Sequence, residues 1–255
     1  MINNRAVQSV VGIIILIALV LLSQWGGEAR GPVSERPAAQ ADQSEVATNK
    51  PDAPHSNATF DYYVLVLSWS PTHCSSGAGR GRDDDLQCRS GRPYGFVLHG
   101  LWPQYERGYP QNCASNEPRI VARGVLDDVL KISPSEQLVQ HEWEKHGTCS
   151  GLSQRDYFAT GAQAFESMNV PSAYDAPERP IMTTPNEVRQ AFLDANRVMR
   201  GGGVSATCSG NELAELWICL DRKLGPRACS NEVRKRHCGG RKVRMRAVRG
   251  DWPGE

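Results

Sequence analysis

The chain has 255 residues, of which 40% are hydrophobic and 22% are charged, and its formal net charge is +1 at pH 7. This length suits one large domain or two small ones, and the composition excludes a mostly disordered chain and a polytopic membrane protein. Because the net charge is close to zero, any surface that binds a polyanion such as nucleic acid must be local.

The first 27 residues have the profile of an export signal. Arg5 is followed by 22 uncharged residues, and the run Val10–Leu22 within them is apolar. The apolar run suits the core of a signal peptide, whereas the whole uncharged stretch is just long enough to span a bilayer. We therefore predict that residues 1–27 are a cleaved signal peptide or an uncleaved signal anchor, and that the protein is exported to the periplasm or secreted.

Residues 28–58 are predicted to be a disordered linker. They contain four prolines and almost no large apolar side chains, so burial cannot offset the entropy lost on ordering them. A linker of this length reaches on the order of 30 Å. That reach would hold a domain clear of a membrane if the N-terminal segment remains as a tether.

All eight cysteines lie after the linker, which is an even number in a chain with an export signal. Four structural disulfides are the preferred interpretation, because disulfides persist in oxidising compartments. Zinc binding is the alternative, but the sequence has no C-x-x-C pair of the kind that thiolate zinc sites usually use. Spacing alone leaves the pairing of the cysteines open.

Apolar patterns predict two strands early in the domain. Phe60–Trp69 is apolar at nearly every position and rich in β-branched and aromatic residues, as expected for a central strand buried on both faces. Phe96–Leu101 predicts a second strand. Residues 75–93 between them are rich in Gly and Arg, which indicates a surface loop.

Capping patterns predict the helices that follow. Ser133–Glu136 has the form of a capping box with Pro at the first helical position, so a helix is predicted over 134–146. Ser153–Asp156 predicts the start of a second helix. Thr184–Glu187 repeats the capping box and predicts a third helix that runs to about Met199.

Two further strands are predicted after the helices, at Gly203–Cys208 and Glu212–Leu220. Strands, then helices, then strands predict an α+β domain with a central antiparallel β-sheet and packed helices, rather than a doubly wound fold. We expect this disulfide-stabilised domain over residues 59–240, followed by a basic C-terminal segment at 241–255, and we expect a monomer.

Two short segments carry residues suited to acid–base chemistry, since histidine titrates near neutrality. His99 ends a predicted strand, and four ionisable residues follow on the predicted helix. With His141 taken as zero, Lys145 lies near 40°, Glu142 near 100° and His146 near 140° around that helix. These four side chains therefore share one helix face.

A solvated helix face and a zinc site are both less favoured as the origin of this cluster. A solvated face is the common reason for a run of charges, but Trp143 and Cys149 tie the same turns to the core. A zinc protease places two histidines four residues apart, whereas His141 and His146 are five apart, about 140° around the helix. We therefore expect no metal and no cofactor.

The segments 99–103 (HGLWP) and 141–149 (HEWEKHGTC) together resemble the two active-site segments of the ribonuclease T2 family, secreted endoribonucleases with an α+β fold. The likeness extends over Phe60–Cys238. The resemblance implies the disulfides Cys74–Cys88, Cys113–Cys149 and Cys208–Cys238, the last nested around Cys219–Cys229.

The resemblance also implies a mechanism. RNA carries its own nucleophile, the 2′-hydroxyl, so the protein must add a base, an acid for the departing 5′-oxygen, and positive charge for the phosphate oxygens. By resemblance, His146 is the base, His99 is the acid, and Glu142 supports the transition state beside His146. His141 and Lys145 bind the phosphate. The implied reaction cuts single-stranded RNA through a 2′,3′-cyclic phosphate with low base specificity.

Such a reaction predicts a bell-shaped dependence of rate on pH, because one histidine must be neutral and the other charged. The helix dipole and Glu142 favour the charged form of His146, whereas Lys145 and His141 oppose it.

A non-catalytic secreted relative that binds RNA or acts as an effector is the alternative function, and the intact set of ionisable residues argues against it. A zinc hydrolase would lose activity to a chelator.

Trp102 is either a core aromatic or a platform for base stacking, and the resemblance favours stacking. Gln104 and Leu138 depart from residues that many relatives carry at these positions, which leaves the base preference open. His73 is predicted to be structural.

Arg234–Arg249 contains eight Lys or Arg and no acidic residue. A terminal strand is the preferred interpretation, with Val243, Met245 and Ala247 inward and the arginines between them outward; a plain solvated tail would also fit. Auxiliary contact with RNA and contact with anionic lipid are the functional alternatives.

Overall fold

The computed structural model describes residues 59–77, 79, 85–199 and 203–252. The predicted signal segment, 1–27, and the predicted linker, 28–58, lie outside the described residues. Among the helices that are described, none is long and apolar enough to cross a membrane.

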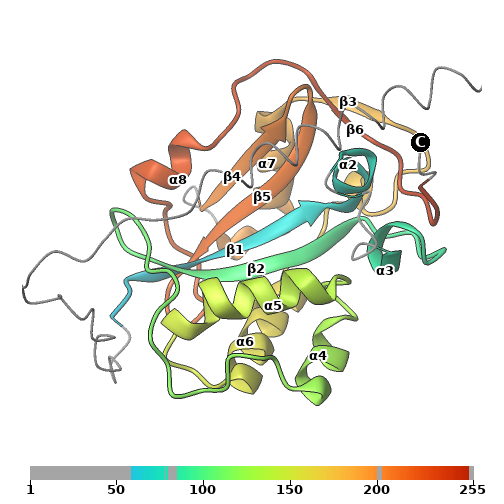
Figure 1. Cartoon of the computed structure of the whole chain (residues 1–255). Helices are drawn as coiled ribbons and strands as arrows, with labels where there is room; N and C mark the ends of the chain where they lie inside the picture. Colours follow the sequence, from blue (N-terminus) through green and yellow to red (C-terminus); the bar gives the residue numbers. More distant parts are fainter. Residues whose placement is uncertain (1–58, 78, 80–84, 200–202, 253–255) are drawn as a thin grey trace, which may run out of the picture. The chain divides into compact units, whose positions relative to one another are not determined.

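Strand β1 (Tyr62–Trp69) runs through the middle of the domain (Figure 1). Its odd-numbered residues pack into the main hydrophobic core, while Tyr62, Val64 and Val66 on the opposite face join a second, smaller cluster. Seven of its eight side chains are buried, and Ser68 is the exception. The prediction of a central strand buried on both faces is confirmed.

β1 is flanked by antiparallel partners in a six-stranded sheet. It pairs with β2 (Phe96–Gln104) on one side and with β5 (Glu212–Leu220) on the other. β4 (Val204–Ser209) pairs antiparallel with β5, and the short strands β3 (Ile181–Thr183) and β6 (Val243–Met245) pair antiparallel with each other. β6 meets β5 through one parallel pair. The predicted α+β class is confirmed, with a sheet that is antiparallel except at this pair.

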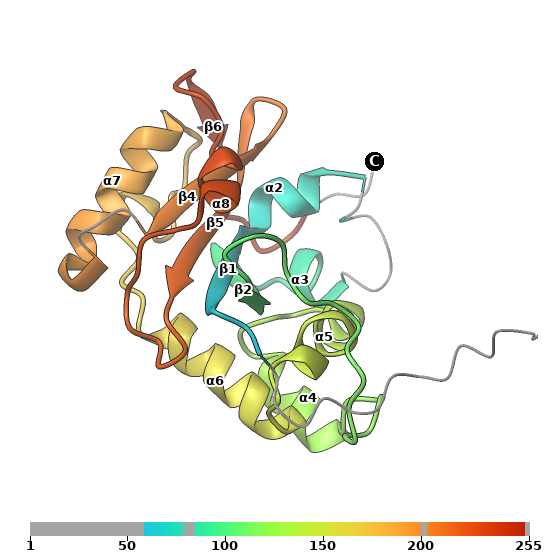
Figure 2. The same cartoon turned by 90° about the vertical axis from the view of Figure 1, so that its left-hand side faces the viewer.

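The described helices are α2 (Ser70–Ser75), α3 (Asp85–Cys88), α4 (Arg123–Val129), α5 (Glu136–Lys145), α6 (Gln154–Glu166), α7 (Pro185–Ala195) and α8 (Asn231–Lys235). Figure 2 shows α6 and α7 on one side of the sheet and α2 on the other. α4 to α7 supply the main core, and α8 supplies the second cluster. α3 lies within the stretch predicted as a loop, and α7 ends four residues before the predicted Met199.

Two of the three predicted helix starts form as expected. Thr184 and Glu187 make the reciprocal hydrogen bonds of a capping box, and Pro185 occupies the first turn of α7. The Ser153 hydroxyl accepts a hydrogen bond from the backbone N–H of Asp156 at the start of α6. Each cap satisfies a backbone donor that the helix itself leaves unpaired.

Helix α5 begins two residues later than predicted. Its N-cap is Ser135, whose hydroxyl accepts from the backbone N–H of Leu138. Ser133 is buried, and its hydroxyl has no hydrogen-bond partner in the described part of the chain. The backbone is still extended at Ser135, so the capping box predicted two residues earlier does not form. His146 is the C-cap of α5, and the predicted helix 134–146 is therefore shortened at both ends.

The eight cysteines form four disulfides, Cys74–Cys88, Cys113–Cys149, Cys208–Cys238 and Cys219–Cys229. These are the pairs that the family resemblance implies. Four disulfides are typical of a protein that folds in an oxidising compartment. The second of them lies directly after α5 and ties the end of this helix to the loop that precedes α4.

The basic C-terminal segment joins the fold through β6. Val243 and Met245 are buried and the arginine between them is exposed, which is the alternation expected of a terminal strand. The carboxylate of Glu212 pairs with Arg244 and Arg246. Glu212 thus ties two of the arginines in this segment to β5.

Candidate active site

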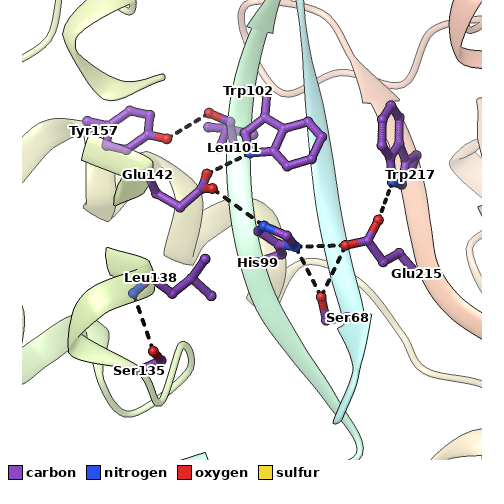
Figure 3. Close-up of polar contacts among 10 residues, drawn as sticks. All are labelled: Ser68, His99, Leu101, Trp102, Ser135, Leu138, Glu142, Tyr157, Glu215 and Trp217. Carbon is purple, nitrogen blue, oxygen red and sulfur yellow. Dashed lines mark hydrogen bonds and ion pairs between the residues drawn. The ribbon is translucent and has the colours of Figure 1, made fainter. Parts of the chain in front are cut away.

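Three of the predicted site residues, His99, Trp102 and Glu142, meet where the C-terminal half of α5 packs against β2 (Figure 3). Val139 and Trp143 hold α5 there, because both are fully buried in the main core. Glu142 and His146 flank these anchors on the helix. They are thereby carried toward the middle of β2, where His99 lies.

Glycines within both motifs permit this close packing. A Cβ atom at Gly100 would overlap the carboxylate of Glu142 and lie 2.7 Å from the indole nitrogen of Trp102. A Cβ atom at Gly147 would overlap the ring of Trp143. Gly100 is therefore needed to bring α5 onto β2, and Gly147 is needed for the chain to pass close to the ring of Trp143 at the end of α5.

Glu142 is deeply buried and finds its partners on β2. Its side chain is 2% exposed. Oε2 accepts a hydrogen bond from Nε1 of Trp102 at 2.6 Å, and Oε1 lies 3.5 Å from Nε2 of His99. Such partners are required because a carboxylate taken out of water is costly when unpaired. Glu142 does lie beside His146, whose backbone N–H donates to the carbonyl of Glu142, but the carboxylate of Glu142 contacts His99 and Trp102.

His99 lies between two carboxylates. Its Nδ1 is 2.7 Å from Oε1 of Glu215 and 3.1 Å from the hydroxyl of Ser68, and its Nε2 faces Glu142. Burial by itself lowers the pKa of His99, but hydrogen bonds and charges from Glu142 and Glu215 outweigh burial and raise it from 6.5 to about 10. His99 therefore carries a proton at neutral pH.

His146 has the opposite environment. It is 3% exposed, and its Nδ1 has no hydrogen-bond partner among the described residues. Burial lowers the pKa of His146 to about 4, and the charges of Lys145, His141 and His99 act in the same direction against Glu142. The sequence shows the charges around His146 but not its burial, which dominates. At neutral pH this ring is uncharged.

Trp102 contacts both histidines. Its ring stacks on His146 with centroids 4.9 Å apart and an interplanar angle of 20°, and it meets His99 edge-on at 5.2 Å. Trp217 packs edge-on against it at 5.0 Å. The side chain is half-buried and touches the second apolar cluster. Trp102 is thus a packed aromatic that also borders the site.

Two pockets open at this cluster. The His99 pocket has a volume of about 570 Å³, and its lining includes Ser68, Thr72, His73, Gln87, Leu138, His141 and Glu215. The His146 pocket has a volume of about 250 Å³, and its lining includes Trp102, Gln104, Tyr109, Lys145, Trp217 and Arg236. The two residues predicted to bind phosphate, His141 and Lys145, therefore line different pockets.

Possible metal ligands are not gathered in the described part of the chain. In the part of the chain that the structure describes, no three His, Cys, Asp or Glu side chains are grouped so that they could hold a metal ion. His141 is exposed and His146 is buried, so the two histidines that opened the zinc hypothesis do not converge on one point.

Ser68, Glu215 and Trp217 complete the site and were not predicted from the sequence. Ser68 and Glu215 lie opposite each other in the pairing of β1 with β5, and the indole N–H of Trp217 donates to Oε2 of Glu215 at 2.9 Å. Ser68 gave a weak signal, as a polar residue near the end of an apolar run. Nothing in the sequence places Glu215, 147 residues later, beside it.

Comparison with known proteins adds an independent observation. A family model described as the Ribonuclease T2 family matches residues 60–229. A protein named Ribonuclease, from Aeromonas hydrophila, is 37% identical over 199 residues, which cover 74% of this chain and 87% of the relative. A protein named Probable ribonuclease, from Haemophilus influenzae, is 32% identical over 191 residues, which cover 70% of this chain and 64% of the relative.

Solved structures agree on the fold. An RNase-related protein from Calystegia sepium superposes with a TM-score of 0.60 at 24% identity, covering 74% of this chain and 98% of its own. The structure of RNase NT in complex with 5′-AMP superposes with a TM-score of 0.55 at 24% identity, covering 74% of this chain and all of its own. At this identity the likeness concerns the fold alone.

Proposed function

Because the chain belongs to the Ribonuclease T2 family and is an endoribonuclease of that type, we propose that it cleaves single-stranded RNA by transphosphorylation through a 2′,3′-cyclic phosphate, without a metal. The family resemblance read from the two motifs is confirmed by the family match. The observation that carries the proposed mechanism is the contrast between His99, which lies between two carboxylates, and His146, which is buried with Nδ1 unpartnered among the described residues. These surroundings favour a charged His99 and a neutral His146.

The proposed first step needs a neutral His146 and a charged His99 at the same time. Neutral His146 removes the proton of the 2′-hydroxyl as the oxygen attacks phosphorus, and charged His99 gives its Nε2 proton to the 5′-oxygen as the P–O5′ bond breaks. The products are a 2′,3′-cyclic phosphate and a free 5′-hydroxyl. The two histidines then exchange roles when water opens the ring. Glu142 holds the Nε2 side of His99 before substrate binds.

The substrate would occupy both pockets. His141, at the His99 pocket, and Lys145, at the His146 pocket, supply positive charge to the phosphate region from two directions. A base would enter the His146 pocket, where Trp102, Tyr109 and Trp217 offer aromatic surfaces. Stacking is tolerant of base identity, which supports low base specificity. Unpaired RNA is required because a stacked base cannot enter such a pocket.

The test is incubation of the purified protein with single-stranded RNA in the presence of EDTA, followed by analysis of the new ends. The proposal expects 2′,3′-cyclic phosphate and 5′-hydroxyl ends, with EDTA having no effect. DNA and RNA methylated at the 2′-oxygen should bind without being cut, because the nucleophile is absent or blocked. Cleavage of DNA, or loss of activity with EDTA, would contradict the mechanism.

We extend the proposal to the setting of the enzyme. The predicted export signal at 1–27 and the four disulfides support an exported ribonuclease that acts in the periplasm or outside the cell. We propose that it acts as a monomer. Retention of 1–27 as an anchor would tether it to the membrane. Fractionation of cells, with N-terminal sequencing of the product, distinguishes the cleaved from the tethered form.

A further inference from the structure

We propose that Glu215 is a positioning residue for His99: it holds Nδ1 so that Nε2 faces the scissile phosphate, and it keeps the acid protonated after substrate has displaced Glu142. This inference rests on the proposed function, since it assigns a role within the same reaction. Neither motif of the sequence contains Glu215, which comes from β5 on the far side of β1.

Both carboxylate oxygens of Glu215 have a hydrogen-bond partner. Oε1 lies 2.7 Å from Nδ1 of His99, and Oε2 accepts from the indole N–H of Trp217 at 2.9 Å. The hydroxyl of Ser68 lies within 3.4 Å of Oε1 and within 3.1 Å of Nδ1. Figure 3 shows these contacts as one chain from Trp217 to His99. A carboxylate held at both oxygens has little freedom to turn, so it fixes the imidazole plane.

This contact also determines which proton His99 can give. Nδ1–H donates to Glu215, so the proton on Nε2 is the one left to transfer. After that transfer the ring is neutral and still donates Nδ1–H to Glu215. Nε2 then points at the same place as an acceptor, which is what the second step of the reaction requires.

The charge of Glu215 matters because Glu142, the other carboxylate that contacts His99, lies where the substrate must bind. Glu142 from α5 faces Nε2 of His99, the atom that must reach the departing oxygen. His146 and His141 of α5 and His73 of α2 are the other titratable groups near this ring, and the charge of His99 and that of His146 disfavour each other. Once Glu142 is displaced, Glu215 is the remaining carboxylate that holds the proton on His99.

The experiment compares Glu215→Gln with Glu212→Gln, a control on the same strand whose carboxylate pairs with Arg244 and Arg246 instead. The readouts are kcat and kcat/KM against pH on a dinucleotide, which report the substrate-bound and the free enzyme respectively, and the titration of the His99 ring by NMR. With Glu215→Gln we expect the basic limb and the His99 midpoint to move to lower pH by about 1 to 3 units, the usual effect of removing a close opposite charge. The amide lacks this charge whichever way it turns. Glu212→Gln should move neither.

A second variant separates positioning from charge and remains informative if Glu215→Gln folds poorly. Glu215→Asp keeps the charge but cannot reach both partners, so the limb should stay near its wild-type position while the rate falls about tenfold. An unmoved limb and unmoved His99 titration in Glu215→Gln would overturn the inference, as would a wild-type rate in Glu215→Asp.

The outcome is separable from a failure of the proposed function. If wild type leaves cyclic phosphate ends and His99→Ala is inactive, an unmoved limb in Glu215→Gln counts against the role of Glu215 alone. If the ends are not cyclic, the reaction itself is wrong and this role falls with it. In that case the His99 titration would still report whether Glu215 holds the proton on the ring.

Discussion

The two histidines of the site carry the same side chain and are held in opposite ways. His99 has a carboxylate at each ring nitrogen, whereas His146 is buried against an indole with one nitrogen unpartnered among the described residues. Close carboxylates favour the charged ring, and burial without a partner favours the neutral one. The difference shows how one fold can hold a charged and a neutral histidine at the same pH, as the proposed acid and base require.

Removing either histidine should have the largest effect on the rate, because each is proposed to transfer a proton in the reaction. His99→Ala and His146→Ala should each lower kcat on the order of 10²- to 10⁴-fold, the usual contribution of a positioned acid or base. Thermal unfolding serves as the control for folding. A variant that folds normally and keeps more than a tenth of the wild-type rate would show that its histidine is neither acid nor base.

Displacing Glu142 should lower the pKa of His99 and so reduce the difference between the two histidines. Gly100→Ala places a methyl group where the Glu142 carboxylate lies, so we expect at least a tenfold loss of rate and a loss of about 1 to 3 kcal/mol in the free energy of unfolding. Gly124→Ala is the control, since a methyl group there meets no atom within 4 Å. A normal rate in Gly100→Ala would mean that the position of Glu142 is unimportant.

Stability should depend on pH with opposite signs through the two rings. The raised pKa of His99 means that its charged form stabilises the fold. That contribution is complete below the ordinary pKa of about 6.5 and is lost as pH rises toward about 10. The lowered pKa of His146 means that its contribution is complete above the ordinary pKa and is lost as pH falls toward about 4.

Chemical denaturation across pH measures both effects. His99→Gln should flatten the alkaline side of the stability profile and His146→Gln the acid side, each by at most about 1.4 kcal/mol per pH unit. Titratable groups that contact neither ring contribute equally to wild type and variants. Glu215 is not among them, because His99, against the effect of burial, lowers the pKa of its carboxyl, so the acid side of the His99→Gln profile includes the loss of this pair. Profiles that stay parallel to wild type would mean that neither ring is perturbed by folding.

The smallest predicted effect tests whether the opposite protonation of His99 and His146 depends only on the immediate surroundings of each ring. Ser135→Ala removes the N-cap of α5 and should cost about 1 kcal/mol, while Ser133→Ala should cost less because that hydroxyl has no partner among the described residues. Neither change should move the limbs of the rate profile. A shifted limb in Ser135→Ala would mean that the helix as a whole, and not the surroundings of His146, sets its protonation.

The sequence predicts what is local and misses what depends on chain folding. The capping box at Thr184 and the doubly buried strand at Phe60–Trp69 follow from neighbouring residues, and both are confirmed. The start of α5 was predicted with Ser133 as the N-cap, whereas the N-cap is Ser135, because nothing local shows where extended backbone ends.

The site divides in the same way. His99, Glu142 and His146 could be predicted because two contiguous motifs carry them. Glu215 could not, since its closeness to His99 depends on strand pairing across β1. The pKa of His146 could not either, because charge is written in the sequence and burial is not.

The disulfide between Cys113 and Cys149 has a consequence for when the enzyme becomes competent. It joins the turn just after His146 to the loop whose Asn112 N–H donates to the carbonyl of Lys145, so it helps to fix the end of α5 that carries the base. Thiols stay reduced in the cytosol, and this bond forms only in an oxidising compartment. If the enzyme is exported as proposed, a newly made copy that has not yet left the cell would hold the end of α5, with the proposed base, loosely, and this would spare the RNA of the cell that made it.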